Sequence, residues 1–237
     1  MQKEAPDIVC LQETKAFSHQ IPPELRVLPY QNICRHTGQR PWYAGTAILS
    51  KEHWHNHANT FEYSQKFDED GRVTEVEYDD FTLINIYFPN GSPRADGTEM
   101  LQYKLDFYDE LLSYINEKQQ NWHNIIIVGD FNICHHEIDI ARPKENENSI
   151  WFLPIERAKV TEFLHKGGMV DIFRHFHPDT INEYTRRSYR AGARPRNVWR
   201  RLDYVMTNKS FLPRIESFRH RQDIMGSDHC PVEIVLR

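Results

Sequence analysis

The sequence predicts a four-layer α/β (α+β) sandwich, in which two packed mixed sheets are flanked by helices. Three observations predict this class: short apolar strands outnumber helices, hairpin-like neighbours alternate with helical crossovers, and no linker divides the 237 residues. Apolar residues make up 39% of the chain and charged residues 27%, which is enough apolar material for a sizeable core. We therefore expect a single domain over residues 1–237.

Apolar runs predict the strands in the first half of the chain. Residues 7–11 (DIVCL) and 46–50 (TAILS) are short runs of this kind with polar flanks. Residues 72–78 and 81–88 flank an Asp-Asp turn, which indicates a β-hairpin. Because residues 81–88 (FTLINIYF) are apolar on both faces, we expect this strand to be central in its sheet.

The second half of the chain contains the predicted helices. Residues 99–119 carry apolar side chains at steps of three and four, which builds one stripe along a helix. Residues 154–165 begin with proline and are followed by Gly167 and Gly168, as is typical of a helix start and end. Further strands are expected at residues 124–128, 202–207, 215–220 and 231–236.

The charge and the cysteines exclude several classes of protein. Lys and Arg number 29 against 34 Asp and Glu, a net charge of −5, so contacts to an anionic partner must come from a local patch. No apolar run approaches the length of a membrane-spanning helix, and the first residues lack the apolar core of a signal peptide. The four cysteines are scattered, so we expect reduced thiols in a cytoplasmic protein with no membrane partner.

Residues suited to phosphate chemistry gather where the predicted strands begin or end. They are Glu13, Tyr87, Asn90, Asp130, Asn132, Asp203, Asp228 and His229. Singly, each has a plainer interpretation: Gly-Asp-Phe-Asn is often only a turn, Ser-Asp-His a loop, and Glu13 a solvated acid. Jointly, the carboxylate and amide oxygens are ligands that Mg²⁺ prefers. A histidine beside carboxylates suits orientation or proton transfer at a phosphoryl group.

Five motifs, in this order, carry a resemblance to a known family: LQETK, YFPNG, GDFN, RLDY and SDH. Together they resemble the exodeoxyribonuclease III / abasic-site (AP) endonuclease family of the endonuclease–exonuclease–phosphatase superfamily, over essentially the whole chain. The EIDIARPK and SYRAGARPRNV segments favour this branch over lipid or inositol phosphate phosphatases.

The resemblance implies a DNase I-like fold and a DNA repair nuclease that depends on Mg²⁺, with Mn²⁺ as the alternative ion. Such an enzyme cuts the phosphodiester 5′ to abasic sites and has 3′-phosphodiesterase or 3′→5′ exonuclease activity. Its partner would be double-stranded DNA with abasic sites or 3′ ends, and the protein would act as a monomer.

The resemblance also implies metal and water contacts. Glu13 would bind the metal ion, with Asp228 near the same ion, and Asp130, Asn132 and His229 would complete the ligand set. Asp130 would orient or deprotonate the attacking water. Asn132 would hold that water or stabilise the pentacovalent transition state.

The implied substrate contacts involve a wider set of residues. His229, held by Asp203, would stabilise charge on the scissile phosphate, and Tyr87 would contact that phosphate or assist the leaving oxygen. Further substrate-binding residues would be Lys15, Asn90, Asn146, Arg186, Arg200 and Arg201. The basic stretch 186–201 would supply phosphate contacts.

The chain departs from the family pattern in two ways. Family members begin with a strand that carries a metal-site Asn, and this chain begins after that strand. A wrongly assigned start codon at Met1 is the interpretation we favour, and a real, inactivating truncation is the other. In addition, four tryptophans occupy positions that are usually Gly, and four arginines occupy positions that are usually aromatic: Trp42, Trp122, Trp151 and Trp199, and Arg35, Arg186, Arg187 and Arg200.

A reassigned genetic code is one hypothesis for the second departure, in which UGA means Gly and some CGN codons mean Trp. Genuine divergence, or a paralogue that has lost its pocket, is the alternative. Two competing functions also stay open. One is a superfamily phosphodiesterase or phosphatase that acts on non-DNA phosphates, and the other is a catalytically inactive DNA-binding relic.

Overall fold

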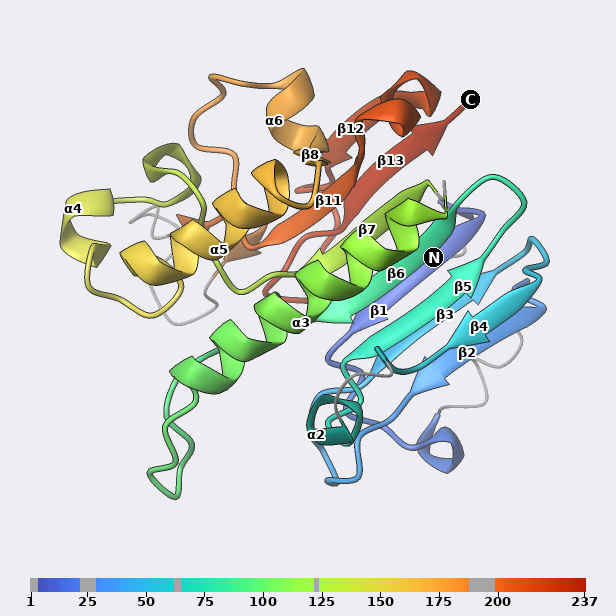
Figure 1. The fold of residues 1–237 in the computed structure, drawn as a ribbon, viewed down its shortest axis with the longest axis horizontal. Coiled ribbons are helices and arrows are strands. Elements are labelled where there is room, and N and C mark those ends of the chain that lie inside the picture. The colour runs from blue at the N-terminus through green and yellow to red at the C-terminus, as the bar shows by residue number, and fades with distance from the viewer. Residues whose placement is uncertain (1–3, 22–28, 62–64, 122–123, 188–198) are drawn as a thin grey trace. The chain divides into compact units, whose positions relative to one another are not determined.

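The chain forms two compact units. Figure 1 shows the helices and strands, coloured from the N-terminus to the C-terminus. The first unit is Met1–Phe88 with Glu117–Gly129, and the second is Pro89–Asn116 with Asp130–Arg237. The computed structural model describes residues 4–21, 29–61, 65–121, 124–187 and 199–237. Both units combine strands with helices, and the single domain expected from the sequence stays a prediction.

The first unit contains two sheets. One has three antiparallel strands in the order β1-β3-β2, namely β1 at Ile8–Gln12, β2 at Asn32–His36 and β3 at Thr46–Ser50. The other sheet includes, in spatial order, β4 at Asn56–Ala58, β5 at Val73–Glu77, β6 at Thr82–Tyr87 and β7 at Ile125–Asp130. The 3-10 turn η1 (Ser18–Gln20) and the short helix α2 (Gln65–Asp68) lie in the connections.

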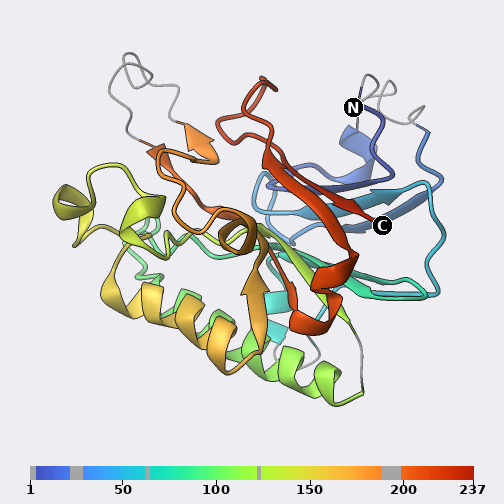
Figure 2. The same cartoon turned by 90° about the horizontal axis from the view of Figure 1, so that it is seen from above.

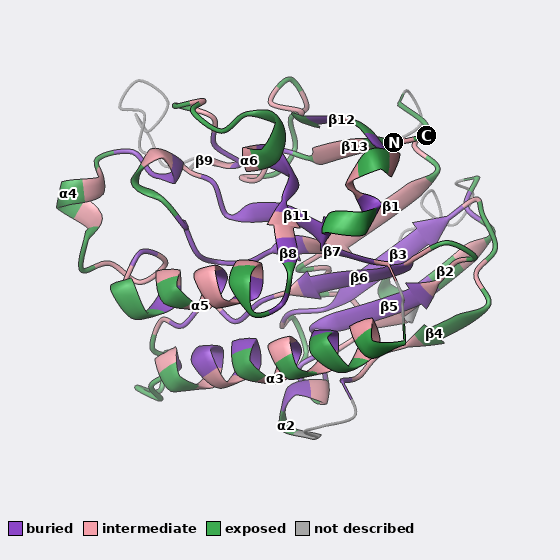
Figure 3. Ribbon diagram, turned by 45° about the horizontal axis from the view of Figure 1, so that its top comes forward, coloured by how far each residue is buried: buried purple, intermediate pink, exposed green. Residues whose placement is uncertain are grey.

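Asn85 joins the two sheets of the first unit. Its strand β6 lies between β5 and β7, which confirms the predicted central position, and Figure 3 shows this strand buried along most of its length. The fully buried Asn85 donates from Nδ2 to the backbone oxygens of Leu11 in β1 and Ala47 in β3, each at 3.0 Å. An unpaired amide here would cost about 1–3 kcal/mol, so these bonds constrain how the sheets pack.

The second unit contains short antiparallel strand pairs and the longer helices. β8 (Met169–Asp171) pairs with β11 (Asp203–Asn208), β9 (Arg186–Arg187) with β10 (Trp199–Arg200), and β12 (Ile215–His220) with β13 (Val232–Leu236). The helices are α3 at Leu101–Gln120, whose last turn belongs to the first unit, α4 at Pro143–Asn146, α5 at Pro154–His165 and α6 at Ile172–Phe176. The 3-10 turns are η2 at Glu137–Asp139 and η3 at Lys209–Arg214. None of the helices in the described part of the chain is both long and apolar enough to span a membrane.

Helices α3 and α5 lie side by side (Figures 2 and 3), and aromatic rings fill the core beneath them. Tyr108 of α3 meets Phe163 of α5 edge to face, with ring centroids 5.8 Å apart. Phe131, just after β7, contacts Tyr108 and also Tyr204 of β11. The hydroxyl of Tyr108 donates to the backbone oxygen of Phe131 at 2.6 Å, and that of Tyr204 to Ile133 at 2.8 Å. Buried hydroxyls therefore hold the segment that follows Asp130.

Most predicted elements are confirmed, and so is the mixed α/β class with packed sheets. The strands at residues 46–50 and 215–220 and the helix at residues 154–165 have the predicted bounds, and the long helix is Leu101–Gln120 where residues 99–119 were expected. Strands β2, β4, β8, β9 and β10 were not predicted. They are between 2 and 5 residues long, and several are polar, so no apolar period marks them.

Gly129, at the end of β7, has no room for a side chain. Its φ is +144°, and an added Cβ would lie 1.8 Å from the backbone oxygen of Ile86 in the neighbouring strand. We expect Gly129→Ala to lower the free energy of unfolding by more than about 3 kcal/mol, because backbone strain and a backbone clash add together. Urea denaturation measures this difference. Gly97→Ala is the control, since Gly97 has φ +83° but nothing within 4 Å. An equal loss in both variants would contradict the steric argument.

Candidate active site

A histidine and two aspartates meet in the second unit. Asp130 is the last residue of β7, Asp203 is the first residue of β11, and His229 lies in the loop before β13. His229 Nδ1 is 2.8 Å from Asp203 Oδ2, and His229 Nε2 is 4.0 Å from Asp130 Oδ2. One ligand atom from each side chain lies within 4.8 Å of the other two. The structure therefore brings three of the predicted residues together.

This cluster fixes the charge of His229. Burial by itself lowers the pKa of an imidazole, but the carboxylates of Asp203 and Asp130 outweigh burial and raise the pKa of His229 to about 10. Burial raises the pKa of Asp130 to about 7, although the charge of His229 opposes that rise. His229 is thus an imidazolium at neutral pH. This state favours its predicted role at the phosphate over its predicted role as a metal ligand, which needs a neutral ring.

Asn132 lies beside Asp130, two residues beyond it along the chain. The buried Asn132 has a left-handed backbone with φ +54°, a conformation that Asn tolerates better than most residues. Its N–H donates to Asp130 Oδ1 at 2.9 Å, and its Oδ1 accepts from Asn90 Nδ2 at 3.2 Å. The Gly-Asp-Phe-Asn motif therefore ends strand β7, and the local bond between the Asp130 side chain and the Asn132 N–H holds the two site residues together.

Asp228 does not join this cluster. Its Oδ2 lies 3.5 Å from Arg186 Nε, and 42% of its side chain is exposed. Its backbone oxygen accepts from the N–H of Arg187 at 2.6 Å, so strand β9 lies against the Ser-Asp-His loop. The metal role predicted for Asp228 and the substrate role predicted for Arg186 stay predictions.

Arg201 is placed differently from the prediction. Its side chain is 0% exposed, with Nε 2.8 Å from Asp139 Oδ1 and Nη2 2.7 Å from Asp171 Oδ2. Arg174 binds the same Asp139 carboxylate. In this structure Arg201 offers no surface to a substrate, because its charge is needed to balance two buried carboxylates.

The other predicted substrate contacts of the second unit are partly buried. Arg200 holds its guanidinium 4.2 Å from the centre of the Trp151 ring. Asn146 donates to the backbone oxygens of Ala141 and Arg142. The middle of the basic stretch, residues 188–198, lies outside the described residues, as does Trp122.

Glu13, Lys15 and Tyr87 form a group within the first unit. The hydroxyl of Tyr87 donates to Glu13 Oε1 at 2.9 Å, and Lys15 Nζ lies 2.9 Å from the same oxygen. Backbone hydrogen bonds hold this loop to Ala44 and Gly45. The Glu13 side chain is 43% exposed, so its carboxylate is open to solvent and already attracts one cation.

Arg72 supports this group and was not among the residues predicted from the sequence. Its Nη1 donates to the backbone oxygen of Tyr87 at 3.1 Å, and its guanidinium lies 5.2 Å from the centre of the Tyr87 ring. Its Nε lies 3.1 Å from Asp70 Oδ2, and both side chains are nearly buried. The one feature of the sequence that could have pointed to Arg72 is its charge at the start of the predicted strand of residues 72–78.

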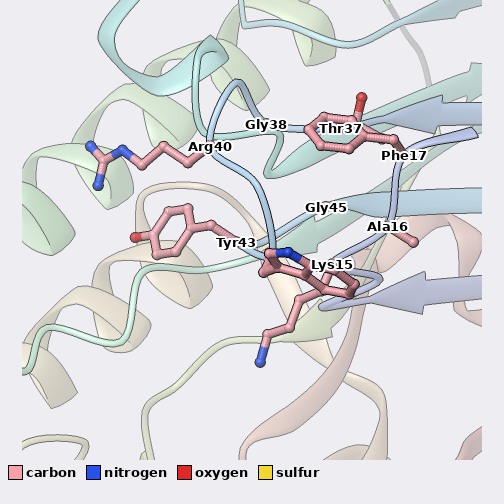
Figure 4. Close-up of a pocket in the computed structure, with 9 residues that line it drawn as sticks. Lys15, Ala16, Phe17, Thr37, Gly38, Arg40, Tyr43 and Gly45 are labelled. Carbon is pink, nitrogen blue, oxygen red and sulfur yellow. The ribbon is translucent and has the colours of Figure 1, made fainter. Parts of the chain in front are cut away.

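A hollow in the first unit includes Lys15 in its wall (Figure 4). It is lined by Lys15, Ala16, Phe17, Thr37, Gly38, Arg40, Trp42, Tyr43 and Gly45. Cations and aromatic rings occur together in surfaces that bind nucleic acids. Trp42 is 71% exposed and has φ +60°, which is unusual for so bulky a residue.

The family of the chain follows from comparisons with known proteins. A family model described as the Endonuclease/Exonuclease/phosphatase family matches residues 1–229, and this chain belongs to that family. The chain is 38% identical over 242 residues to an exodeoxyribonuclease of Bacillus subtilis (strain 168), covering 100% of this chain and 90% of that protein. It is also 38% identical over 238 residues to a DNA-(apurinic or apyrimidinic site) endonuclease of Dictyostelium discoideum, covering 100% of this chain and 64% of that protein.

A solved structure confirms the fold. An AP endonuclease from Archaeoglobus fulgidus is 26% identical, with a TM-score of 0.86, and the match covers 99% of this chain and 90% of that chain. The predicted DNase I-like class and the predicted family are therefore correct. The protein is a phosphodiester-hydrolysing enzyme from a family of metal-dependent nucleases, and its acidic cluster is a candidate metal site.

In the metal-free protein, we expect the His229 imidazole to titrate near pH 10. Because its folded pKa lies above the ordinary value of 6.5, its contribution to stability is complete below pH 6.5 and is lost as the pH rises toward 10. NMR titration of the ring protons measures the pKa. Asp203→Asn removes the nearest carboxylate and should return the pKa toward 6.5. An ordinary pKa in the unsubstituted protein would refute this account.

Proposed function

We propose that this protein is a Mg²⁺-dependent DNA repair nuclease. It hydrolyses the phosphodiester 5′ to an abasic site and has 3′-phosphodiesterase or 3′→5′ exonuclease activity. The observation that carries the proposal is the cluster of His229, Asp203 and Asp130, because it offers a donor for a phosphate beside an acceptor for a water proton. Relatives named exodeoxyribonuclease and abasic-site endonuclease support DNA as the substrate.

The residues of the second unit act on the water and the phosphate. Asp130 orients the attacking water and takes its proton, which suits a carboxyl whose pKa burial has raised to about 7. Asn132, fixed beside it, holds the same water or the transition state. His229 donates from Nε2 to a phosphate oxygen while Asp203 holds Nδ1, so the imidazolium meets the charge that develops there.

The carboxylate and amide oxygens of the predicted site residues suit a hard cation such as Mg²⁺. A bound Mg²⁺ stabilises charge on the phosphate and leaving oxygens, and Mn²⁺ would fill the same role. Within the second unit, Asp130, Asn132 and Asp228 would hold it, because carboxylate and amide oxygens are its preferred ligands. Glu13, which the family resemblance also assigns to the metal, offers an exposed carboxylate in the first unit. Tyr87, which already shares Glu13 with Lys15, contacts the phosphate or assists the leaving oxygen.

Double-stranded DNA with abasic sites or 3′ ends is the proposed partner. The net charge of −5 gives no general attraction, so Lys15, Arg186 and Arg200 supply local contacts, with Asn90 and Asn146 as polar ones. A site that already lacks its base is the cheapest one to extrude from the duplex. We also propose that the protein is a monomer in the cytoplasm, where its free cysteines stay reduced.

Asp130→Ala and His229→Ala should each lower the rate of Mg²⁺-dependent nicking by about 10²–10⁴-fold, because each removes a group that acts in the transition state. The assay is cleavage of a duplex that carries a single abasic analogue. His175→Ala and Asp179→Ala are matched controls, since both residues are exposed and lie outside the cluster.

The same assay separates the competing functions. Turnover of non-DNA phosphates with indifference to the duplex would favour a different phosphodiesterase or phosphatase. Salt-sensitive DNA binding without turnover, even in a chain extended upstream of Met1, would favour an inactive relic. Unchanged rates in both alanine variants would contradict the site assignment.

We also propose that the gene uses a reassigned genetic code, in which UGA means Gly and some CGN codons mean Trp. This reassignment would change residues of the proposed substrate pocket. Trp42 and Trp151 have φ of +60° and +83°, a region that glycine occupies freely and tryptophan rarely. Two contacts also pair a disputed arginine with a disputed tryptophan: Arg200 on Trp151 and Arg187 on Trp199, each at 4.2 Å. With the reassigned code, each arginine becomes Trp and each tryptophan becomes Gly. Each contact then still contains one indole ring, supplied by the other residue of the pair.

Peptide mass mapping of the protein from its native source should therefore find Gly at 42, 122, 151 and 199 and Trp at 35, 186, 187 and 200. Sequencing the gene is the second measurement. Ordinary UGG codons at the four tryptophan positions would end the hypothesis.

A further inference from the structure

Lys104 is a buried cation that the proposed chemistry does not use. It lies on the buried face of α3, and its side chain is 0% exposed. Its Nζ has three acceptors: Glu156 Oε1 at 2.5 Å, the backbone oxygen of Asn132 at 2.8 Å and that of Asn90 at 3.2 Å. An ammonium group has three N–H donors, so this set satisfies it.

Both backbone acceptors belong to residues of the proposed site. Asn90 and Asn132 also bond to each other through their side chains at 3.2 Å, and the N–H of Asn132 binds Asp130. Lys104 thus ties together the backbones of Asn90 and Asn132, the residues whose side chains bond to each other and one of which binds Asp130. Asn132 has a left-handed backbone, and Lys104 supplies one of the hydrogen bonds that hold it there.

The chain makes room for this cation and balances its charge. Gly91, directly after Asn90, has φ +85°, and an added Cβ there would lie 2.9 Å from Lys104 Cδ. Glu156 is fully buried beside Lys104, and its other oxygen accepts from the N–H of Leu153 at the start of α5. The glycine of the YFPNG motif and the acid at the start of α5 therefore serve the same lysine.

We propose that Lys104 is a positioning residue for the reaction: it holds the backbone of Asn90 and Asn132 so that their side chains and Asp130 align the attacking water. Glu156 pairs with the Lys104 ammonium group and holds it in place. This inference rests on the proposed nuclease function. A displacement of the loop by about 1 Å costs turnover far more than binding, because an aligned water matters in the transition state.

The test separates positioning from simple stability. Lys104→Met alone leaves Glu156 buried without its cation, which destabilises the fold. The double variant Lys104→Met with Glu156→Gln removes both charges. We expect it to melt near the temperature of the unsubstituted protein, with kcat for the abasic duplex lowered about 100-fold and KM little changed. Hydrogen exchange at the amide of Asn132 should become faster.

A conservative variant and a matched control sharpen the result. Lys104→Gln with Glu156→Gln keeps an N–H₂ group that reaches for the same carbonyls, so it should recover part of the lost kcat. Lys159→Met with Asp109→Asn removes a second ion pair between α5 and α3, at 2.5 Å, whose two residues are not part of the proposed site. Its kcat should be unchanged.

Each outcome decides the proposal. A folded Lys104→Met, Glu156→Gln variant with unchanged kcat and slow exchange at Asn132 would overturn it. If that variant does not fold, hydrogen exchange at the Asn132 amide is measured in the unsubstituted protein. An unprotected amide there would show that the loop is not held, and would overturn the proposal. If the unsubstituted protein does not nick abasic DNA, the proposed function fails, and the exchange comparison still tests the hold of Lys104 on the loop.

Discussion

Buried charge is the constraint on which this structure depends. An ionised side chain that leaves water must meet an opposite charge and fill its hydrogen bonds, or it costs several kcal/mol. Arg72 meets Asp70, Lys104 meets Glu156, and Arg201 meets Asp139 and Asp171. Arg72 also donates to the backbone oxygen of Tyr87, and Lys104 to those of Asn90 and Asn132. Pairs that look purely structural therefore fix where the chemistry is placed.

The same constraint sets the protonation state of His229. Asp203 and Asp130 lie close enough to hold the ring protonated, so the histidine is a donor and a positive charge rather than a base. Asp130, buried beside that charge, keeps a pKa of about 7 and can accept a proton at neutral pH. One cluster thus supplies an acid and a base, because its members lie in different surroundings.

The long, periodic elements could be predicted from the sequence, and the short ones could not. The stripe along Leu101–Gln120 and the apolar runs at Thr46–Ser50 and Ile125–Asp130 report burial directly. Strand β9 has only two arginines, and it forms because β10 pairs with it, a fact absent from local sequence. Lys104 was missed for a related reason. A lysine on an apolar stripe looks like an exception until its partners, 14 to 52 residues away, are known.

The sequence by itself determined the family and the residue types of the site, because motifs at strand ends record the chemistry that a phosphodiester needs. Only the tertiary structure decided which residues pair. Asp228 is adjacent to His229 in sequence, yet its carboxylate faces Arg186, while His229 binds Asp203, 26 residues away. Arg201 and Arg200 are also neighbours, but one is buried between two carboxylates and the other lies on an indole ring. Neighbouring side chains in an extended chain point to opposite sides, so each meets a different environment, and only the folded chain decides what that environment is.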